Sequence, residues 1–136
     1  MKLTNEVLGH ALLRIGLGLA FIAHGLARIG ILSAFAESMK GMFAKRMLPE
    51  VLVVITAYAT PPVELIVGIA LLLGLFLRPA LVIAGIEMWV LMFGSILIQK
   101  FDIALIQLVY LTLLALLTAT LRYDRLSIDG WRHRAS

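Results

Sequence analysis

The sequence lacks cysteine entirely and contains few charged residues for its length of 136. Without cysteine, the chain itself cannot supply a disulfide, a thiolate nucleophile or the sulfur ligands of an iron–sulfur cluster. Charged residues make up 15% of the sequence, whereas a soluble domain contains roughly 25%. Hydrophobic residues make up 62%, and the mean hydropathy is +1.03. A chain this short cannot bury so much apolar surface in a core, so we expect lipid to cover it.

The net charge of +4 and the pI near 9.9 would suggest a nucleic-acid partner if the protein were soluble. Here the basic residues gather near the ends of the apolar segments and in the tail at 122–136. Anionic lipid headgroups explain this placement better. The expected partners are therefore the lipid bilayer and either another protein or further copies of this chain, and not nucleic acid.

Four apolar segments have the length that crosses a hydrocarbon core about 30 Å thick, which is about 20 residues for a helix. We therefore predict an all-α fold, an integral membrane four-helix bundle that forms a single domain over 1–136. The spans are expected at 7–29, 61–77, 79–98 and 103–121. The first should be retained and not cleaved as a signal peptide, because Arg14 interrupts its apolar stretch.

Two adjacent prolines, Pro61 and Pro62, stand inside the apolar run 48–77. One helix over that run would be about 45 Å long, so we expect a helix start at Pro61 with Thr60 as its cap. A kink in one long helix fits the pattern equally well. The segment 32–59 is then interfacial. Its first part is amphipathic, and either the membrane surface or a partner chain would cover its apolar residues, Phe35, Met39, Met42, Phe43 and Met47.

Ionisable residues inside the spans carry the strongest functional signal, because charge in hydrocarbon is costly and usually faces the bundle interior. At a rise of about 1.5 Å per residue these groups fall at two depths. Arg14 and Glu87 share one depth and are predicted to form a buried structural ion pair. Glu64 lies at the other depth, one turn past the prolines where we expect a cavity, and should meet His24 or Arg28.

No complete active site is visible in the sequence. The spans contain only His10 and His24, which lie about 21 Å apart on one helix and cannot bracket a haem iron. No other group of residues has the spacing of a metal site or of a nucleophile–base pair. We expect no metal and no covalently bound cofactor, and at most a non-catalytic or quinone-binding role in an oxidoreductase.

Three segments resemble the DoxX-like family of small four-helix membrane proteins. The first is LLRIGLGLAFIAHGLARIG at 12–30, with Arg14, Gly18, His24-Gly25 and Arg28. The second is VELIVGIALLLGLFLRPA at 63–80, with Glu64, Gly68, Gly74 and Arg78. The third is the tail RYDRLSIDGWRHR at 122–134, in which Ser127-Ile128-Asp129 resembles the closing motif. The resemblance implies a membrane protein linked to redox systems; some members are the membrane subunit of thiosulfate:quinone oxidoreductase.

Our first hypothesis for function is therefore a small membrane subunit of a redox or respiratory complex that anchors a partner. A quinone pocket near the prolines would use Glu64, His24 and Arg28, with Tyr58 or Trp89 at its flank. One alternative is a proton-coupled small-molecule transporter that uses Glu64, although Arg14 in the first span would disfavour a cation. The other is a purely structural assembly subunit, whose buried charges only fix the bundle.

We expect a multi-pass protein of a bacterial-type cytoplasmic membrane. An even number of spans places both termini on one side of that membrane. The positive-inside rule and the basic tail favour the cytoplasm for that side. The basic residues there are Lys2, Arg78, Arg122, Arg125, Arg132 and Arg134, against Arg28, Lys40, Lys45, Arg46 and Lys100 on the other side.

Overall fold

The computed structural model describes residues 2–135, in which there is no strand. Its helices are α1 (Asn5–Ile29), α2 (Leu32–Phe43), α3 (Glu50–Leu73), α4 (Leu77–Leu97), α5 (Phe101–Ala119), the 3-10 helix η1 (Leu121–Tyr123) and α6 (Ile128–Ala135). The helices α1, α3, α4 and α5 are each long and apolar enough to cross a membrane. The predicted all-α membrane bundle is confirmed.

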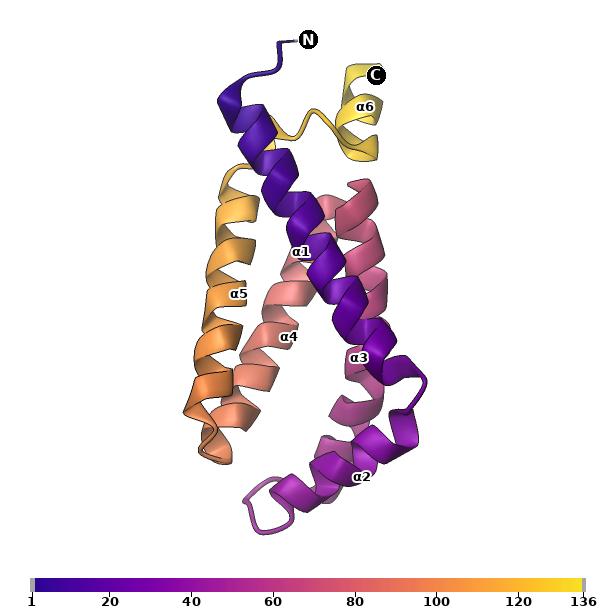
Figure 1. Cartoon of the computed structure of the whole chain (residues 1–136), viewed down its shortest axis with the longest axis vertical. Helices are drawn as coiled ribbons and strands as arrows, with labels where there is room; N and C mark the ends of the chain where they lie inside the picture. The colour runs from indigo at the N-terminus through magenta and orange to yellow at the C-terminus, as the bar shows by residue number, and fades with distance from the viewer. Residues whose placement is uncertain (1, 136) are drawn as a thin grey trace.

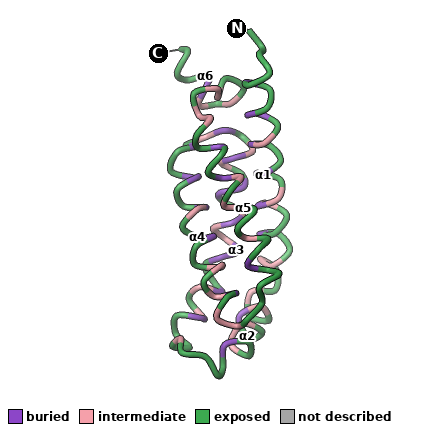
Figure 2. The backbone as a smooth tube through the Cα atoms, turned by 90° about the vertical axis from the view of Figure 1, so that its left-hand side faces the viewer, coloured by how far each residue is buried: buried purple, intermediate pink, exposed green. Residues whose placement is uncertain are grey.

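The four long helices run side by side along the length of the molecule, and both chain ends lie at the same end of the bundle (Figure 1). The short helix α6 covers that end, whereas α2 and the α4–α5 turn lie at the opposite end. Buried residues face inward along the bundle and exposed residues form most of the outer surface (Figure 2). The core is made of apolar side chains from all four long helices, among them Leu17, Phe21, Val67, Leu71, Leu81, Met88, Leu114 and Leu117.

The predicted helix start at Pro61 is wrong, because α3 runs from Glu50 through both prolines to Leu73. Prolines are tolerated inside membrane helices where neighbouring helices and Ser or Thr side chains support the interrupted backbone. Pro61 is fully buried, and the Thr60 hydroxyl donates to the carbonyl oxygen of Thr56 at 2.7 Å and does not cap a helix. Residues 50–59 therefore belong to the same helix as the second span.

The amphipathic segment does form a separate helix, α2, which packs against α3. Its Lys40 lies 3.2 Å from a carboxylate oxygen of Glu37 and 3.3 Å from one of Glu50 at the start of α3. Hydrogen bonds to Glu37 and Glu50 raise the pKa of Lys40. Phe43 is buried, while Met47 is 95% exposed. The predicted covering of the outer face, by membrane surface or partner, stays a prediction.

Two glycines allow α1 and α3 to approach at backbone distance. A Cβ atom on Gly18 would lie 2.7 Å from the backbone nitrogen of Leu72, and one on Gly68 would lie 2.6 Å from that of Ile22. Any larger residue would force the helices apart, which is the reason small residues mark close contacts between membrane helices. This contact sets how the polar groups of α1 and α3 face each other.

Candidate functional site

Arg14 of α1 is the most deeply buried charge, with 2% of its surface exposed. Its Nη1 atom donates to the carbonyl oxygens of Leu71 and Leu72, both at 2.7 Å, where α3 ends. Its Nη2 atom donates to the carbonyl oxygen of Leu126 at 2.6 Å. One guanidinium therefore joins the first span to the end of the second and to the chain that follows the last.

The predicted Arg14–Glu87 ion pair is wrong, because the carboxylate near Arg14 belongs to Asp124. Its Oδ1 atom lies 3.8 Å from Arg14 Nε and 3.7 Å from His10 Nε2. The prediction compared only the depths of residues inside the spans. It did not consider the tail, which folds back over the end of the bundle and brings Asp124 to Arg14. Sequence reasoning missed Asp124; the available signal was a lone acid directly after the last span, among basic residues.

The tail motif Ser127-Ile128-Asp129 fixes this return of the chain. The Ser127 hydroxyl donates to Asp124 Oδ2 at 2.6 Å and accepts from the backbone N–H of Gly130 at 2.9 Å. The Ser127 side chain lies directly against Gly74, which ends α3 in the left-handed conformation with φ of 70°. A Cβ at position 74 would collide with the Ser127 side chain, and the left-handed conformation also favours glycine there.

Asp129, the last residue of the motif, caps the start of α4. Its carboxylate accepts the backbone N–H groups of Phe76 at 3.1 Å and Leu77 at 2.8 Å, at the start of α4. Since caps of this kind contribute about 1–2 kcal/mol, Asp129→Ala should lower the unfolding free energy by about that amount. Thermal unfolding in detergent would measure the loss, and Asp129→Asn, which keeps an acceptor oxygen, should lose less. Equal stability of all three proteins would contradict the capping role.

At the level of the prolines, Glu64 of α3 meets Arg28 of α1. Arg28 Nη1 lies 3.4 Å from each oxygen of the Glu64 carboxylate. Glu64 is 4% exposed, whereas Arg28 is half-buried and its guanidinium lies over the ring of Phe35 of α2, 5.0 Å from the ring centre. Of the two partners predicted for Glu64, the structure shows contact with Arg28.

A second buried acid, Glu87 of α4, lies close enough to Glu64 and Arg28 for each charge to act on it. Both of its carboxylate oxygens are buried and accept no hydrogen bond from residues 2–135, and the same holds for Oε1 of Gln107 on α5. An unpartnered polar group in a membrane interior is costly, which makes Glu87 a candidate functional residue. We name Arg28, Glu64 and Glu87 the carboxylate cluster.

His24 and Tyr110 form a polar pair beside this cluster. His24 Nε2 lies 3.3 Å from the Tyr110 hydroxyl, and the Tyr110 ring is edge-on to Phe21 with centroids 5.9 Å apart. His24 precedes Arg28 by four residues and therefore shares its face of α1. His24 is exposed, while Tyr110 is half-buried.

A groove of about 470 Å³ opens between α1 and α5 and contains Tyr110 in its wall. All of its other lining residues are apolar: Leu12, Leu13, Gly16, Leu17, Ala20, Ile106, Val109 and Leu113. The groove thus joins an apolar slot to the hydroxyl that contacts His24. This combination of apolar walls and a few polar groups is typical of ligand sites.

The DoxX family model matches residues 9–98, which is more than half of the chain. The chain belongs to the DoxX family. No curated protein and no solved structure matches it. The four apolar helices together with this membrane family identify a multi-pass membrane protein. The match extends from α1 to the end of α4, so the predicted DoxX resemblance of the first two spans is confirmed.

Within the DoxX match lie His24, Arg28, Glu64 and Glu87, whereas Tyr110 of α5 and the tail motif lie beyond it. The predicted resemblance of residues 122–134 to the DoxX closing motif therefore stays a prediction. The structure nevertheless gives this tail a defined place. Asp124 pairs with Arg14, the Ser127 hydroxyl donates to Asp124, and Asp129 accepts the backbone N–H of Leu77.

Two residues predicted to flank the quinone pocket lie on the outer surface. Tyr58 is 43% exposed and Trp89 is 60% exposed. Within residues 2–135, no hydrogen bond or ring contact joins either of them to His24, Arg28 or Glu64. The aromatic residue that the structure places beside His24 is Tyr110, which sequence reasoning noted only as a polar side chain of the last span.

Proposed function

We propose that this DoxX protein is the membrane subunit of a redox complex and that it binds a quinone between α1 and α5. The tail of the quinone would lie in the apolar groove, and its head group would meet His24 and Tyr110. The observation that carries the proposal is the continuity of the groove with this pair, because Tyr110 belongs to both.

The side chains present fit such a ligand. A quinone needs an apolar slot and hydrogen-bond donors for its carbonyl oxygens, and His24 Nε2 and the Tyr110 hydroxyl can donate. When bound, the quinone would supply the electron-accepting chemistry. Protons could be held by the carboxylate cluster, in which Arg28 positions Glu64 while the Glu87 oxygens remain open to a new partner.

The electrons would come from a protein partner that contacts the chain outside the groove. We place the protein in the cytoplasmic membrane, with both termini in the cytoplasm. The common end of the two termini (Figure 1) and the basic residues there support this orientation by the positive-inside rule. Purification in mild detergent, followed by mass spectrometry of co-purifying proteins, would identify the partner or show a homo-oligomer.

Gly16→Leu should abolish quinone binding without unfolding the protein. A Cβ on Gly16 has no atom within 4 Å, so the leucine would project into the groove and occupy the space of the tail. Titration of the purified protein with decylubiquinone would measure the affinity. Gly85→Leu, on α4 and equally free of contacts, is the matched control and should bind as the wild type does.

Tyr110→Phe tests the head-group contact, and its loss of one hydrogen bond should weaken binding about fivefold to tenfold.

Glu64→Gln should leave the fold intact and impair turnover of the assembled complex. Absence of quinone binding to the wild-type protein, or equal binding by all of these variants, would refute the quinone site.

A second candidate function is proton-coupled transport, which the two buried acids Glu64 and Glu87 favour. Reconstituted liposomes distinguish the two functions. A proton flux that follows the pH gradient, disappears in Glu64→Gln and persists in Gly16→Leu would support transport. Quinone binding without such flux would support the redox subunit.

A further inference from the structure

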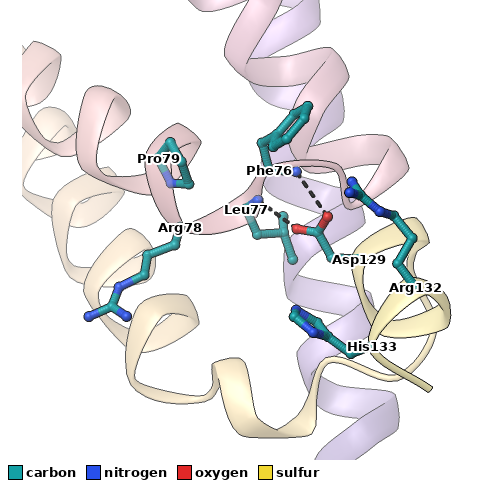
Figure 3. A pocket seen from close by; sticks show the side chains of 7 residues that line it. All are labelled: Phe76, Leu77, Arg78, Pro79, Asp129, Arg132 and His133. Carbon is teal, nitrogen blue, oxygen red and sulfur yellow. Dashed lines mark hydrogen bonds between the residues drawn. The ribbon is translucent and has the colours of Figure 1, made fainter. Parts of the chain in front are cut away.

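A separate cavity of about 460 Å³ lies at the end of the bundle that holds the termini. Its walls come from two segments far apart in the sequence, the first turn of α4 and the helix α6 (Figure 3). The residues that matter for its chemistry are Phe76, Arg78 and Pro79 from the first segment and Asp129, Arg132 and His133 from the second. None of them belongs to the proposed quinone site.

The charge of this cavity is predominantly positive. The only acid in its wall, Asp129, uses both oxygens to accept the N–H groups of Phe76 and Leu77. Neither Arg78 nor Arg132 is within salt-bridge distance of a carboxylate in the part of the chain that the structure describes. In Figure 3 the Arg78 and Arg132 side chains lie on opposite sides of Asp129, and the His133 ring lies below its carboxylate.

The apolar part of the cavity wall is placed for contact with lipid. Phe76 is 60% exposed and stands directly before Leu77, where the apolar helix α4 begins. Trp131, on the same short helix as Arg132, is 63% exposed, and exposed aromatic residues next to a span mark the headgroup level. The Arg132 guanidinium lies over the Phe76 ring at 5.7 Å. Cation and apolar surface thus adjoin where the apolar helix α4 begins.

We infer that the cavity between α4 and α6 binds the phosphate of an anionic phospholipid. Arg78 and Arg132 would bind the phosphate oxygens from two sides, and Phe76 and Pro79 would contact the glycerol and upper acyl chain. Basic pockets at the ends of membrane helices bind such headgroups by the same chemistry. Because Asp129 already satisfies the helix start, the guanidiniums and not the backbone provide the attraction.

Native mass spectrometry of the full chain, delipidated in detergent and titrated with phosphatidylglycerol or phosphatidylcholine, would test the inference. The wild-type protein should bind one phosphatidylglycerol more tightly than phosphatidylcholine. The double variant Arg78→Gln/Arg132→Gln should bind phosphatidylglycerol about 30-fold more weakly. Thermal unfolding without lipid should change little, because both side chains are exposed and the contact of Arg132 with the exposed Phe76 ring is weak.

Arg122→Gln/Arg125→Gln is the matched control, since it removes two charges from the same end of the bundle but outside the cavity. It should bind within about twofold of the wild type. An equal loss in this control would show attraction by surface charge alone and overturn the site, as would equal binding of the two lipids. Displacement of the lipid by millimolar inorganic phosphate would also overturn the assignment, because the site would then take a soluble anion.

Discussion

Replacing Arg14 with alanine should lower the unfolding free energy by about 3–5 kcal/mol, which is the range for breaking a buried ion pair by removing one partner. The variant would leave the carbonyl oxygens of Leu71, Leu72 and Leu126 without their donor. Asp124 would also remain buried beside His10 without its cation. Unfolding by SDS in mixed micelles would measure the loss, and we expect little folded protein at 37 °C.

The control for Arg14 is Arg122→Ala, because Arg122 is exposed on the same end of the bundle. That change should alter stability by less than about 0.5 kcal/mol. The double variant Arg14→Met/Asp124→Leu separates charge from shape, since exchange of both partners for apolar residues removes the unpaired charge. It should recover part of the stability lost in Arg14→Ala. If Arg14→Ala unfolds like Arg122→Ala, Arg14 does not hold the chain ends together.

The second large effect is expected for Gly18→Leu. The first added atom would already lie 2.7 Å from the backbone nitrogen of Leu72 and 3.0 Å from the carbonyl oxygen of Gly68. Because backbone atoms cannot move aside as side chains do, α1 would be pushed away from α3, at a cost of about 3 kcal/mol or more. The shift would also separate Arg28 from Glu64, so quinone or proton-linked activity should be lost together with stability.

Gly9→Leu, on the same helix, is the control for Gly18→Leu because a Cβ there has no atom within 4 Å. It should be neutral or slightly stabilising, since glycine is a poor helix former by about 0.5–1 kcal/mol relative to alanine. The two variants can be compared by thermal unfolding in one detergent. Equal melting temperatures would show that α1 and α3 are not in close contact in the membrane.

The sequence predicted the four spans and the amphipathic helix because hydropathy and helical periodicity are local properties. It also predicted the contact of Glu64 with Arg28 as one of two alternatives, since both residues share a depth. It misplaced the start of the second span because local rules for proline omit support from a neighbouring helix. Arg14 was paired with the wrong acid because its partner Asp124 belongs to a segment that turns back after the last span.

The groove between α1 and α5 could not be predicted, because it depends on how far two helices separate and not on which residues they contain. Tyr110 was visible only as a polar residue of the last span, and nothing local connects it to His24, 86 positions earlier. Such a pairing requires the order and rotation of the helices. Pattern analysis of one sequence supplies neither of these.

The contacts of Arg14 also impose an order on biosynthesis. Arg14 lies in α1, which is translated before α3 and the tail, while its partners Asp124 and Leu126 lie more than a hundred residues later. During insertion its guanidinium can bind the carbonyl oxygens of Leu71 and Leu72 once α3 has been translated, whereas its contacts with the tail form only after residues 124–126 have been translated. A chain that ends before Asp124 would keep the Arg14 cation without its carboxylate partner, and we expect membrane proteases to recognise and degrade it. The contacts of Arg14 with the tail can therefore form only after all four long helices have been translated.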